Sequence, residues 1–358
     1  MSTDDARQVL KDAIARRVFP ATVFDVGSSH ASLSRQALGR LTFDADAPST
    51  DIATIFDLAS LTKVIATTTV VMELVHTGAV DLDQSVAGCL DEWRGADRES
   101  VTIRDLLEHS SGLPARLIDA PVGRRREFEH DICTMPLEYG PQSKSIYSDL
   151  GFILLGFIAA DRGARSLDSQ FEEIRVRLAA RDTELSADAL SFGVAADSKN
   201  RAAATRPLEQ DPRRGRRLVG EVHDDYAATL GGVAGHAGLF GTASGVGAFA
   251  RTVLRAARGD VALPEPFSAA RVREFTARSR VPGSSRALGW DTMLPTSSCG
   301  TRMSPAAFGH VGFTGTSLWI DPARDRYFVL LTNRALGAGS LDDIRQVRRD
   351  FHDALATI

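Results

Sequence analysis

The sequence predicts an α+β fold, in which an antiparallel sheet flanked by terminal helices is joined to an all-helical subdomain. Strand-like segments are confined to the first and last thirds of the chain, and helix-like segments fill the middle. A length of 358 residues exceeds what one hydrophobic core usually supports. We therefore expect a single domain over 1–358, with a sheet subdomain from 1–65 and 231–358 and a helical subdomain from 66–230.

The N-terminal segment predicts one helix followed by two strands. Residues 7–18 place apolar side chains on one side, which is typical of an amphipathic helix. Residues 21–27 and 32–41 indicate strands joined by a G-S-S-H turn, a hairpin signal. The first twenty residues lack the apolar stretch and cleavage site of a secretory leader. We expect a cytoplasmic protein, with a periplasmic or exported location as the alternative.

The middle of the chain predicts buried helices. After a short apolar stretch at 52–58, the run L-T-K-V-I-A-T-T-T-V-V-M-E-L-V-H-T-G begins next to Ser60 and carries apolar residues all round, as a central helix would. Gly78 is a plausible stop for this helix. Thr102, followed three residues later by an aspartate, predicts a capped helix start. Residues 151–161 predict another buried helix, whose ten-residue apolar run is too short to span a bilayer.

The last third predicts closely packed backbone followed by strands. The stretch G-G-V-A-G-H-A-G-L-F-G-T-A, from Gly231, lacks the G-K-[ST] of a phosphate loop, so we expect its glycines to permit close packing near a site or core. Ser340 is predicted to cap a final amphipathic helix over 341–358. Three strands are expected, the last two antiparallel across a D-P-A-R-D turn: 286–293, 308–320 and 327–333.

The composition excludes several classes of function. Hydrophobic content of 43% and charged content of 25% are ordinary for a soluble globular protein, and a net charge of −4 gives no sign of nucleic-acid binding. Three widely spaced cysteines match no zinc pattern and suggest a reducing compartment. H-E-x-x-H and G-x-S-x-G are both absent, so we expect neither a metal hydrolase nor an α/β-hydrolase. No cofactor or metal is expected, and the oligomeric state stays open.

An arginine-rich segment over 196–219 allows two interpretations. It could be a patch for an anionic partner, or a solvated surface loop in a chain that uses arginine for nearly all its basic residues. Only four residues of the chain are lysines. We favour the surface loop.

The first candidate site is S-L-T-K, in which Ser60 precedes Lys63 by three residues. Side chains at this spacing share one face of a helix. A serine hydroxyl becomes a good nucleophile only when a base takes its proton. Burial lowers the pKa of a lysine, so Lys63 in its apolar run could relay that proton. This is the only S-x-x-K in the chain, and a lysine inside such an apolar helix requires a reason.

Two later stretches carry further candidates. Tyr147, in S-I-Y-S-D-L-G-F, comes 87 residues after Ser60, and a tyrosine near an ammonium group could act as a general acid or base with a lowered pKa. Asp149 could cap the following helix or orient substrate. The stretch F-G-H-V-G-F-T-G-T-S-L-W-I-D places polar residues and glycines where a core strand would carry valines, which often marks close approach to a ligand. His310 lies within it.

Together, the order and spacing of these motifs resemble the penicillin-recognising serine hydrolases, in the branch of class C β-lactamases and D-alanyl-D-alanine peptidases that also contains esterases. The family motifs S-x-x-K, Y-x-N and K-T-G correspond here to S-L-T-K, Y-S-D and H-V-G. The segment L-L-E-H-S-S-G-L-P and the order of predicted elements match as well, from about residue 7 to the last helix. The resemblance implies a β-lactamase/transpeptidase-like fold.

The resemblance also implies catalytic roles by position. Ser60 would be the acylated nucleophile, Lys63 would activate it, and Tyr147 would shuttle the proton and help deacylation. The backbone N–H groups of Ser60 and Phe313 would form the oxyanion hole. Such an enzyme would act on a small ester, amide or peptide.

Substrate contacts are implied for Asp149, His310 and Gly312, and two of these depart from the family pattern. Histidine replaces the lysine that helps bind a substrate carboxylate, and it is only partly charged near neutral pH. Aspartate replaces asparagine, so it cannot donate an amide hydrogen bond and would repel an acidic substrate. We therefore expect an esterase, amidase or D-amino-acid peptidase with weak or no β-lactamase activity. The alternative is a catalytically silent member that acts as a ligand-binding or interaction protein.

Overall fold

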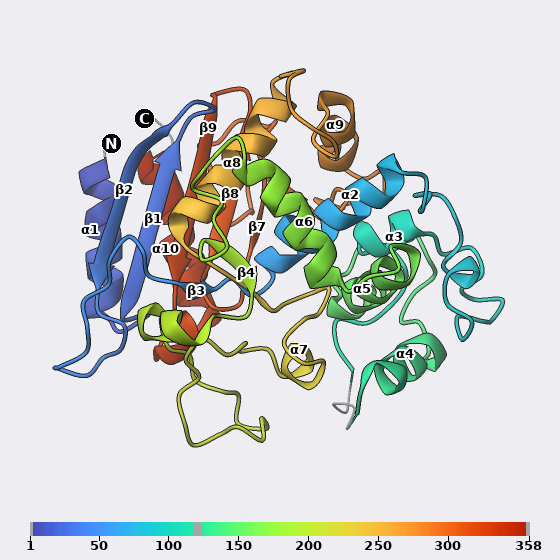
Figure 1. The fold of residues 1–358 in the computed structure, drawn as a ribbon, viewed down its shortest axis with the longest axis horizontal. Coiled ribbons are helices and arrows are strands. Elements are labelled where there is room, and N and C mark those ends of the chain that lie inside the picture. The colour runs from blue at the N-terminus through green and yellow to red at the C-terminus, as the bar shows by residue number, and fades with distance from the viewer. Residues whose placement is uncertain (1–2, 118–122, 356–358) are drawn as a thin grey trace.

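The computed structural model describes residues 3–117 and 123–355, and a six-stranded antiparallel sheet runs along one side of it (Figure 1). The strand order is β2-β1-β9-β8-β7-β6, so the N-terminal hairpin lies against the last strand of the chain, as predicted. The strands are β1 (Ala21–Gly27), β2 (Ser32–Gly39), β6 (Asp291–Thr292), β7 (Phe308–Val311), β8 (Ser317–Asp321) and β9 (Arg326–Thr332).

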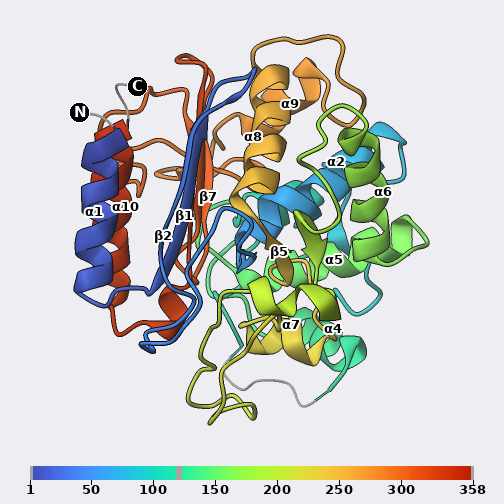
Figure 2. The same cartoon turned by 60° about the vertical axis from the view of Figure 1, so that its left-hand side comes forward.

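Helices cover both faces of this sheet (Figure 2). The terminal helices α1 (Thr3–Ala15) and α10 (Leu341–Leu355) lie side by side on the outer face. Their apolar sides close a core with the sheet, where the rings of Phe24 and Phe351 lie 5.6 Å apart. Helix α8 (Ala243–Ala257) covers the inner face. The predicted cap of α10 is confirmed, because Ser340 Oγ accepts a hydrogen bond from the Asp343 N–H at 3.1 Å.

The last strands differ from the prediction in two respects. The predicted strand over 286–293 is reduced to β6, and Arg286 forms only an isolated bridge with Asp291. The D-P-A-R-D turn does join an antiparallel pair, with Asp321 opposite Arg326. The predicted strand over 308–320, however, is two strands. Residues 312–316 turn the chain back, with Gly312 N–H bonded to the Thr316 carbonyl at 2.8 Å and Gly315 at φ +100°. The apolar residues on either side follow the pattern of one continuous strand, so the sequence does not reveal the glycine turn between them. This turn forms one wall of the site.

The middle of the chain is mainly helical and packs beside α8. Two of its helices correspond to the buried helices predicted after Ser60 and over 151–161, and they are α2 (Thr68–His76) and α5 (Asp149–Arg162). The others are α3 (Ile103–Leu107), α4 (Arg125–Thr134), α6 (Leu167–Ala179) and α7 (Asp225–Thr229). Helix α9 (Ala269–Thr276) lies beside α8. Gly78, at φ +76°, follows the end of α2. Thr102 forms the predicted capping box with Asp105.

A second sheet shows that the segment 66–230 is not purely helical. Strand β4 (Leu190–Phe192) pairs with β5 (Leu239–Gly241), which also pairs with β3 (Phe56–Asp57). The prediction of an all-helical subdomain is therefore wrong at β4, because three residues of backbone pairing leave too short a pattern to detect. This small sheet joins the segment before Ser60 to the glycine-rich segment after Gly231.

The central helix begins irregularly. Residues Lys63–Thr67 form a π-helical turn, in which the Thr68 N–H bonds to the Lys63 carbonyl, before regular α2 begins. The short helical turns at Val86–Gly88, Ala196–Arg201 and Arg334–Leu336 are instead of the 3₁₀ type. Single π-helical turns are frequent at functional sites. The sequence predicts a regular helix here, because apolar content does not distinguish the two geometries.

The arginine-rich segment favours the surface-loop interpretation. Arg213 pairs with Asp211, Arg216 with Glu221, and Arg217 with Asp44. These pairs neutralise much of the charge that an anionic partner would need.

None of the helices in the described ranges has the length and apolarity needed to cross a membrane.

Candidate active site

Ser60 follows a tight turn that other segments hold in place. Ala59 has φ +47°, which is uncommon for a residue with a side chain. Asp57 holds this turn, because its carboxylate accepts the Ala59 N–H at 2.8 Å and the His223 N–H at 2.6 Å. Burial raises the pKa of Asp57 to about 6. The turn presents Ser60 at the surface of a cavity.

Ser60, Lys63 and Tyr147 come together as the sequence predicts. Lys63 Nζ donates a hydrogen bond to Ser60 Oγ at 3.0 Å, and the Tyr147 hydroxyl donates one to the same oxygen at 2.8 Å. Lys63 and Tyr147 come from different segments of the chain, one from the π-helical turn and the other from the residues before α5. The nucleophile candidate thus contacts both groups that could exchange its proton.

The charge of Lys63 differs from the sequence prediction. Its ammonium group is fully buried, and it donates to three acceptors, namely Ser60 Oγ, Asp149 Oδ1 at 2.8 Å and the His236 carbonyl at 3.1 Å. Burial has the largest single effect and lowers the pKa of Lys63, but Asp149 and Tyr147 together outweigh it, and the net pKa is raised. The prediction of a lowered pKa is wrong, because the sequence could not reveal that a carboxylate 86 residues away lies against this lysine.

The pKa of Tyr147 is also higher than the sequence predicts. Lys63 lowers the pKa of Tyr147, but burial has the larger effect, and the net pKa is raised. Its ring lies 4.7 Å from the His109 ring, and Lys63 Nζ lies 4.9 Å from its centre. At neutral pH Tyr147 is therefore a neutral phenol beside an ammonium group.

Asp149 neither caps a helix nor presents a free charge. Ser148 is the cap of α5, because its Oγ accepts the Gly151 N–H. The Asp149 carboxylate instead bonds Lys63 and Arg116, the latter at 3.3 Å. Two cations neutralise it, so the predicted repulsion of an acidic substrate does not follow from this residue.

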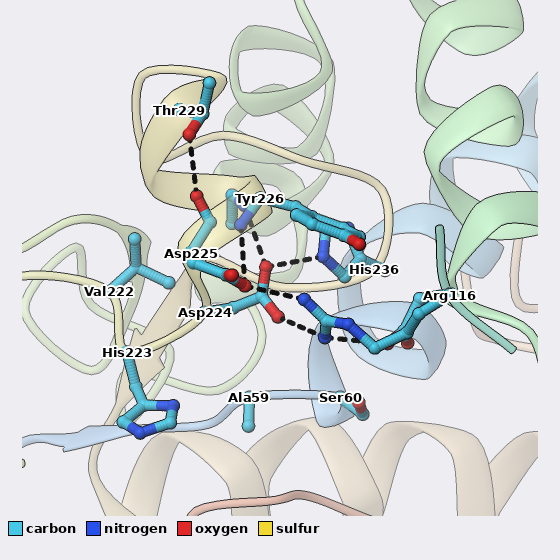
Figure 3. Close-up of polar contacts among 12 residues, drawn as sticks. Ala59, Ser60, Arg116, Val222, His223, Asp224, Asp225, Tyr226, Thr229 and His236 are labelled. Atoms are coloured by element: carbon cyan, nitrogen blue, oxygen red, sulfur yellow. Dashed lines mark hydrogen bonds and ion pairs between the residues drawn. The ribbon is translucent and has the colours of Figure 1, made fainter. Parts of the chain in front are cut away.

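Arg116 and His236 extend these contacts to Asp224 (Figure 3). Arg116 donates to Asp224 at 3.0 Å, and His236 Nε2 lies 2.7 Å from the same carboxylate. Because the His236 carbonyl accepts from Lys63, the chain of contacts returns to its starting point. Burial raises the pKa of Asp224, but His236 and Arg116 lower it more, and the net pKa is lowered. The sequence does not mark Arg116, Asp224 or His236 as site residues, since no motif connects them to S-L-T-K.

The glycine-rich segment packs against the central helices, as predicted. A Cβ atom on Gly235 would lie 1.9 Å from the Phe152 carbonyl oxygen and 2.9 Å from the Gly156 nitrogen. The Gly235 carbonyl accepts a hydrogen bond from Thr67 Oγ1 at 2.6 Å. This close approach places the neighbouring His236 carbonyl on Lys63.

We expect Gly235→Ala to destabilise the protein by about 1–3 kcal/mol, because the new methyl group meets backbone that cannot move freely. Displacing this segment should also weaken the Lys63 contact and lower hydrolytic activity. Chemical denaturation and an ester assay would test both effects. Gly140→Ala is a suitable control, since a Cβ there meets nothing within 4 Å. Equal stability of the two variants would contradict the packing argument.

The turn at 312–316, which carries the predicted oxyanion-hole donor Phe313, is fastened to the segment before Ser60. Thr314 Oγ1 donates to the Asp57 carbonyl at 2.8 Å, and Thr316 Oγ1 donates to the Leu58 carbonyl at 3.0 Å. These bonds fasten the turn beside Ser60. Within the described ranges, the backbone N–H groups of Ser60 and Phe313 donate to no protein acceptor. Two such free donors beside a nucleophile are what an oxyanion hole requires.

His310 and Gly312 both line the cavity, but His310 carries no charge near neutral pH. It is buried, and burial, with Arg286 and Lys63 nearby, lowers the pKa of His310 well below its usual value. Its Nδ1 lies 2.9 Å from the Val311 carbonyl, so Nδ1 carries the proton of the neutral ring. The expectation of partial charge is therefore wrong. Gly312 allows the close contact with Leu58, whose carbonyl a Cβ would approach to 2.7 Å.

The cavity in front of Ser60 has a volume of about 550 Å³. It is large enough for a small organic substrate. All seven predicted site residues except Lys63, which lies buried beneath its floor, line it directly. Across residues 3–117 and 123–355, no group of three or more His, Cys, Asp or Glu side chains is arranged to hold a metal ion.

Solved structures with this fold are numerous, and three of them illustrate the range of their descriptions. EstCE1, "a hydrolase with promiscuous acyltransferase activity", has a TM-score of 0.76 at 17% identity and covers 99% of this chain and 98% of its own. A class C β-lactamase from Rhodobacter sphaeroides has a TM-score of 0.76 at 18% identity, covering 98% and 99%. A penicillin-binding protein homologue from Caulobacter crescentus has a TM-score of 0.70 at 19% identity, covering 98% and 97%. At such identities these similarities establish the fold, which is the β-lactamase/transpeptidase fold predicted from the sequence.

Relatives identified by their sequence share a higher identity with this chain. An Escherichia coli (strain K12) protein named "Putative D-alanyl-D-alanine carboxypeptidase" is 34% identical, over 78% of this chain and 69% of its own. A Salmonella agona (strain SL483) protein of the same name is 31% identical with the same coverage. The model of the β-lactamase family matches residues 7–352, which takes in both sides of the cavity and every residue around Ser60. The chain therefore belongs to the β-lactamase family of serine hydrolases.

Proposed function

We propose that the protein hydrolyses a small ester, amide or D-amino-acid peptide through an acyl-enzyme on Ser60. The observation that carries this proposal is the contact of Ser60 Oγ with Lys63 at 3.0 Å and with Tyr147 at 2.8 Å, at the floor of an open cavity. The names of the relatives and of EstCE1 agree with a peptidase or esterase activity. A role in binding alone would not require these two contacts on one serine oxygen.

In the proposed reaction, Ser60 Oγ attacks the acyl carbon and forms the new C–O bond. The negative charge that develops on the carbonyl oxygen is stabilised by the N–H groups of Ser60 and Phe313. Tyr147 accepts the serine proton and passes it to the departing oxygen or nitrogen as the bond to the acyl carbon breaks. Water then attacks the acyl-enzyme by the reverse route, and Ser60 regains its proton.

The protonation of Lys63 and Tyr147 predicts the pH dependence. Both have raised pKa values, so at neutral pH each holds its proton and neither is a base. The reactive form has lost one proton from this pair, leaving a Tyr147 phenolate beside the Lys63 ammonium. Because raised pKa values make this form scarce at pH 7, activity should rise as the pH increases above neutrality, by about tenfold per unit where one proton is lost.

We expect Asp149→Asn to move this rise to lower pH by about 1–3 units, because the amide removes a negative charge that raises the pKa of Tyr147 as well as that of Lys63. The measurement is the pH profile of kcat for a neutral p-nitrophenyl ester, corrected for spontaneous hydrolysis. Asp225→Asn is the matched control, since Asp225 also bonds Arg116, at 2.6 Å, but does not contact Lys63. An unchanged profile in Asp149→Asn, or an equal shift in the control, would show that Asp149 does not set the protonation of the Lys63–Tyr147 pair.

The proposal itself is tested by intact-protein mass spectrometry after incubation with p-nitrophenyl acetate, a penicillin and a fluorophosphonate. Release of p-nitrophenol is followed in parallel. An adduct that maps to Ser60, with sustained release, would support the serine hydrolase. No adduct from any reagent in folded protein would overturn it in favour of a ligand-binding role.

A further inference from the structure

His109 lies against Tyr147 in a backbone conformation that a histidine seldom adopts. It follows the end of helix α3 at φ +58°, in the left-handed region. Helices commonly end in this conformation, but glycine or asparagine usually occupies the position, because a larger side chain is strained there. A strained residue beside a catalytic group calls for a functional explanation. No step of the proposed reaction uses the motif L-L-E-H-S-S-G-L-P, in which His109 stands.

His109 bonds the backbone on both sides of Tyr147. Its carbonyl accepts a hydrogen bond from the Ile146 N–H at 3.0 Å, and its Nδ1 accepts one from the Ser148 N–H at 3.1 Å. Residues 135–148, between α4 and α5, form neither helix nor strand, so no regular backbone pairing holds Tyr147 in place. The two bonds to His109 therefore fix the residue before Tyr147 and the residue after it.

The ring of His109 also supports the ring of Tyr147. It is buried, and its centre lies 4.7 Å from the centre of the Tyr147 ring and 5.2 Å from that of Phe152. Burial lowers the pKa of His109 well below its usual value, so the ring is neutral and carries its proton on Nε2. Within the described ranges, this Nε2 has no hydrogen-bond partner. A buried donor without a partner is destabilising, so stability alone does not explain a histidine here.

We propose that His109 is a positioning residue for proton transfer, which holds the Tyr147 hydroxyl on Ser60 Oγ through its bond to the Ser148 N–H and its contact with the Tyr147 ring. This inference rests on the proposed function, in which Tyr147 carries the serine proton. The hydroxyl stands at the end of the ring away from the backbone, so a small rotation of the backbone moves it far. Its distance of 2.8 Å from Ser60 Oγ must be kept for proton transfer. His109 does not line the cavity, so its effect passes through Tyr147.

The test compares His109→Leu with His109→Asn. The two new side chains have the same shape, but only asparagine has an acceptor, Oδ1, in the place of Nδ1. We expect His109→Leu to lower kcat for a neutral p-nitrophenyl ester by about 10- to 100-fold with KM within about threefold, because displacing a proton-transfer group slows the chemical step. His109→Asn should stay within about fivefold of the wild-type kcat. His130→Leu is the control, since His130 is exposed, contacts Glu92 and does not line the cavity.

The Tyr147→Phe background separates positioning from a general structural role. Without the hydroxyl there is nothing to position, so adding His109→Leu should lower kcat by less than about twofold further. If His109→Leu does not fold, His109→Gly, which is unstrained at this φ, replaces it in the comparison.

Each contrary outcome has a different meaning. An equal loss from His109→Leu in both backgrounds would overturn the inference and leave the proposed function intact, and so would a wild-type kcat in His109→Leu or an equal kcat in His109→Leu and His109→Asn. A wild-type kcat in Tyr147→Phe would remove Tyr147 from the reaction, and this inference with it. Failure of the wild type to form an acyl-enzyme would overturn the proposed function itself.

Discussion

Replacing Ser60 with alanine is expected to abolish acyl-enzyme formation and to lower kcat/KM for an ester by roughly 10⁴–10⁶-fold, as loss of a serine nucleophile does. No other hydroxyl group can take its place, because Lys63 and Tyr147 both converge on this one oxygen. The fold should survive. Ser60 is partly exposed, and its loss removes one acceptor from Lys63 and leaves two, at a cost of about 1 kcal/mol.

The measurement combines steady-state hydrolysis with intact-protein mass spectrometry after fluorophosphonate treatment. Ser143→Ala serves as the control, since Ser143 is exposed and bonds only the Gly140 carbonyl. The control should label and turn over like the wild type. Full activity or labelling in Ser60→Ala would mean that the nucleophile lies elsewhere.

Replacing Tyr147 with phenylalanine is expected to lower kcat by about 10²–10⁴-fold, the usual contribution of a proton-transfer group. Phenylalanine keeps the ring contacts with His109 and Lys63 but loses the hydroxyl that bonds Ser60 Oγ. The alkaline rise in activity should also flatten, because the group proposed to act as the base is gone. A pH profile of single-turnover acylation measures both effects.

Tyr139→Phe is the matched control for this substitution. The Tyr139 hydroxyl donates to the His109 carbonyl at 3.0 Å, and Tyr139 does not line the cavity. The control should lose about 1 kcal/mol of stability and keep its activity and pH profile. If Tyr147→Phe kept wild-type rates, the proton would have to travel through Lys63 alone.

Local features of the fold and site were predictable because their causes are local. The capping box at Thr102, the stop at Gly78 and the hairpin after Asp321 each depend on residues within one turn of each other. The pairing of Ser60 with Lys63 depends on a spacing of three residues. The predicted strand over 308–320 failed for the complementary reason, since a glycine turn inside an apolar segment is stabilised by distant contacts from Asp57 and Leu58.

By itself, the sequence determined which chemical groups are available and in what order, through S-x-x-K, Y-x-D and H-x-G and the strands at both ends of the chain. Only the tertiary structure decided the state of those groups. Lys63 is an ammonium because Asp149, 2.8 Å away, and Tyr147 together outweigh its burial, and His310 is neutral because it is buried near cations. Arg286, which no motif marks, reaches the Tyr147 ring only through folding. Charge and burial act through space, so a pKa depends on neighbours that sequence distance does not reveal.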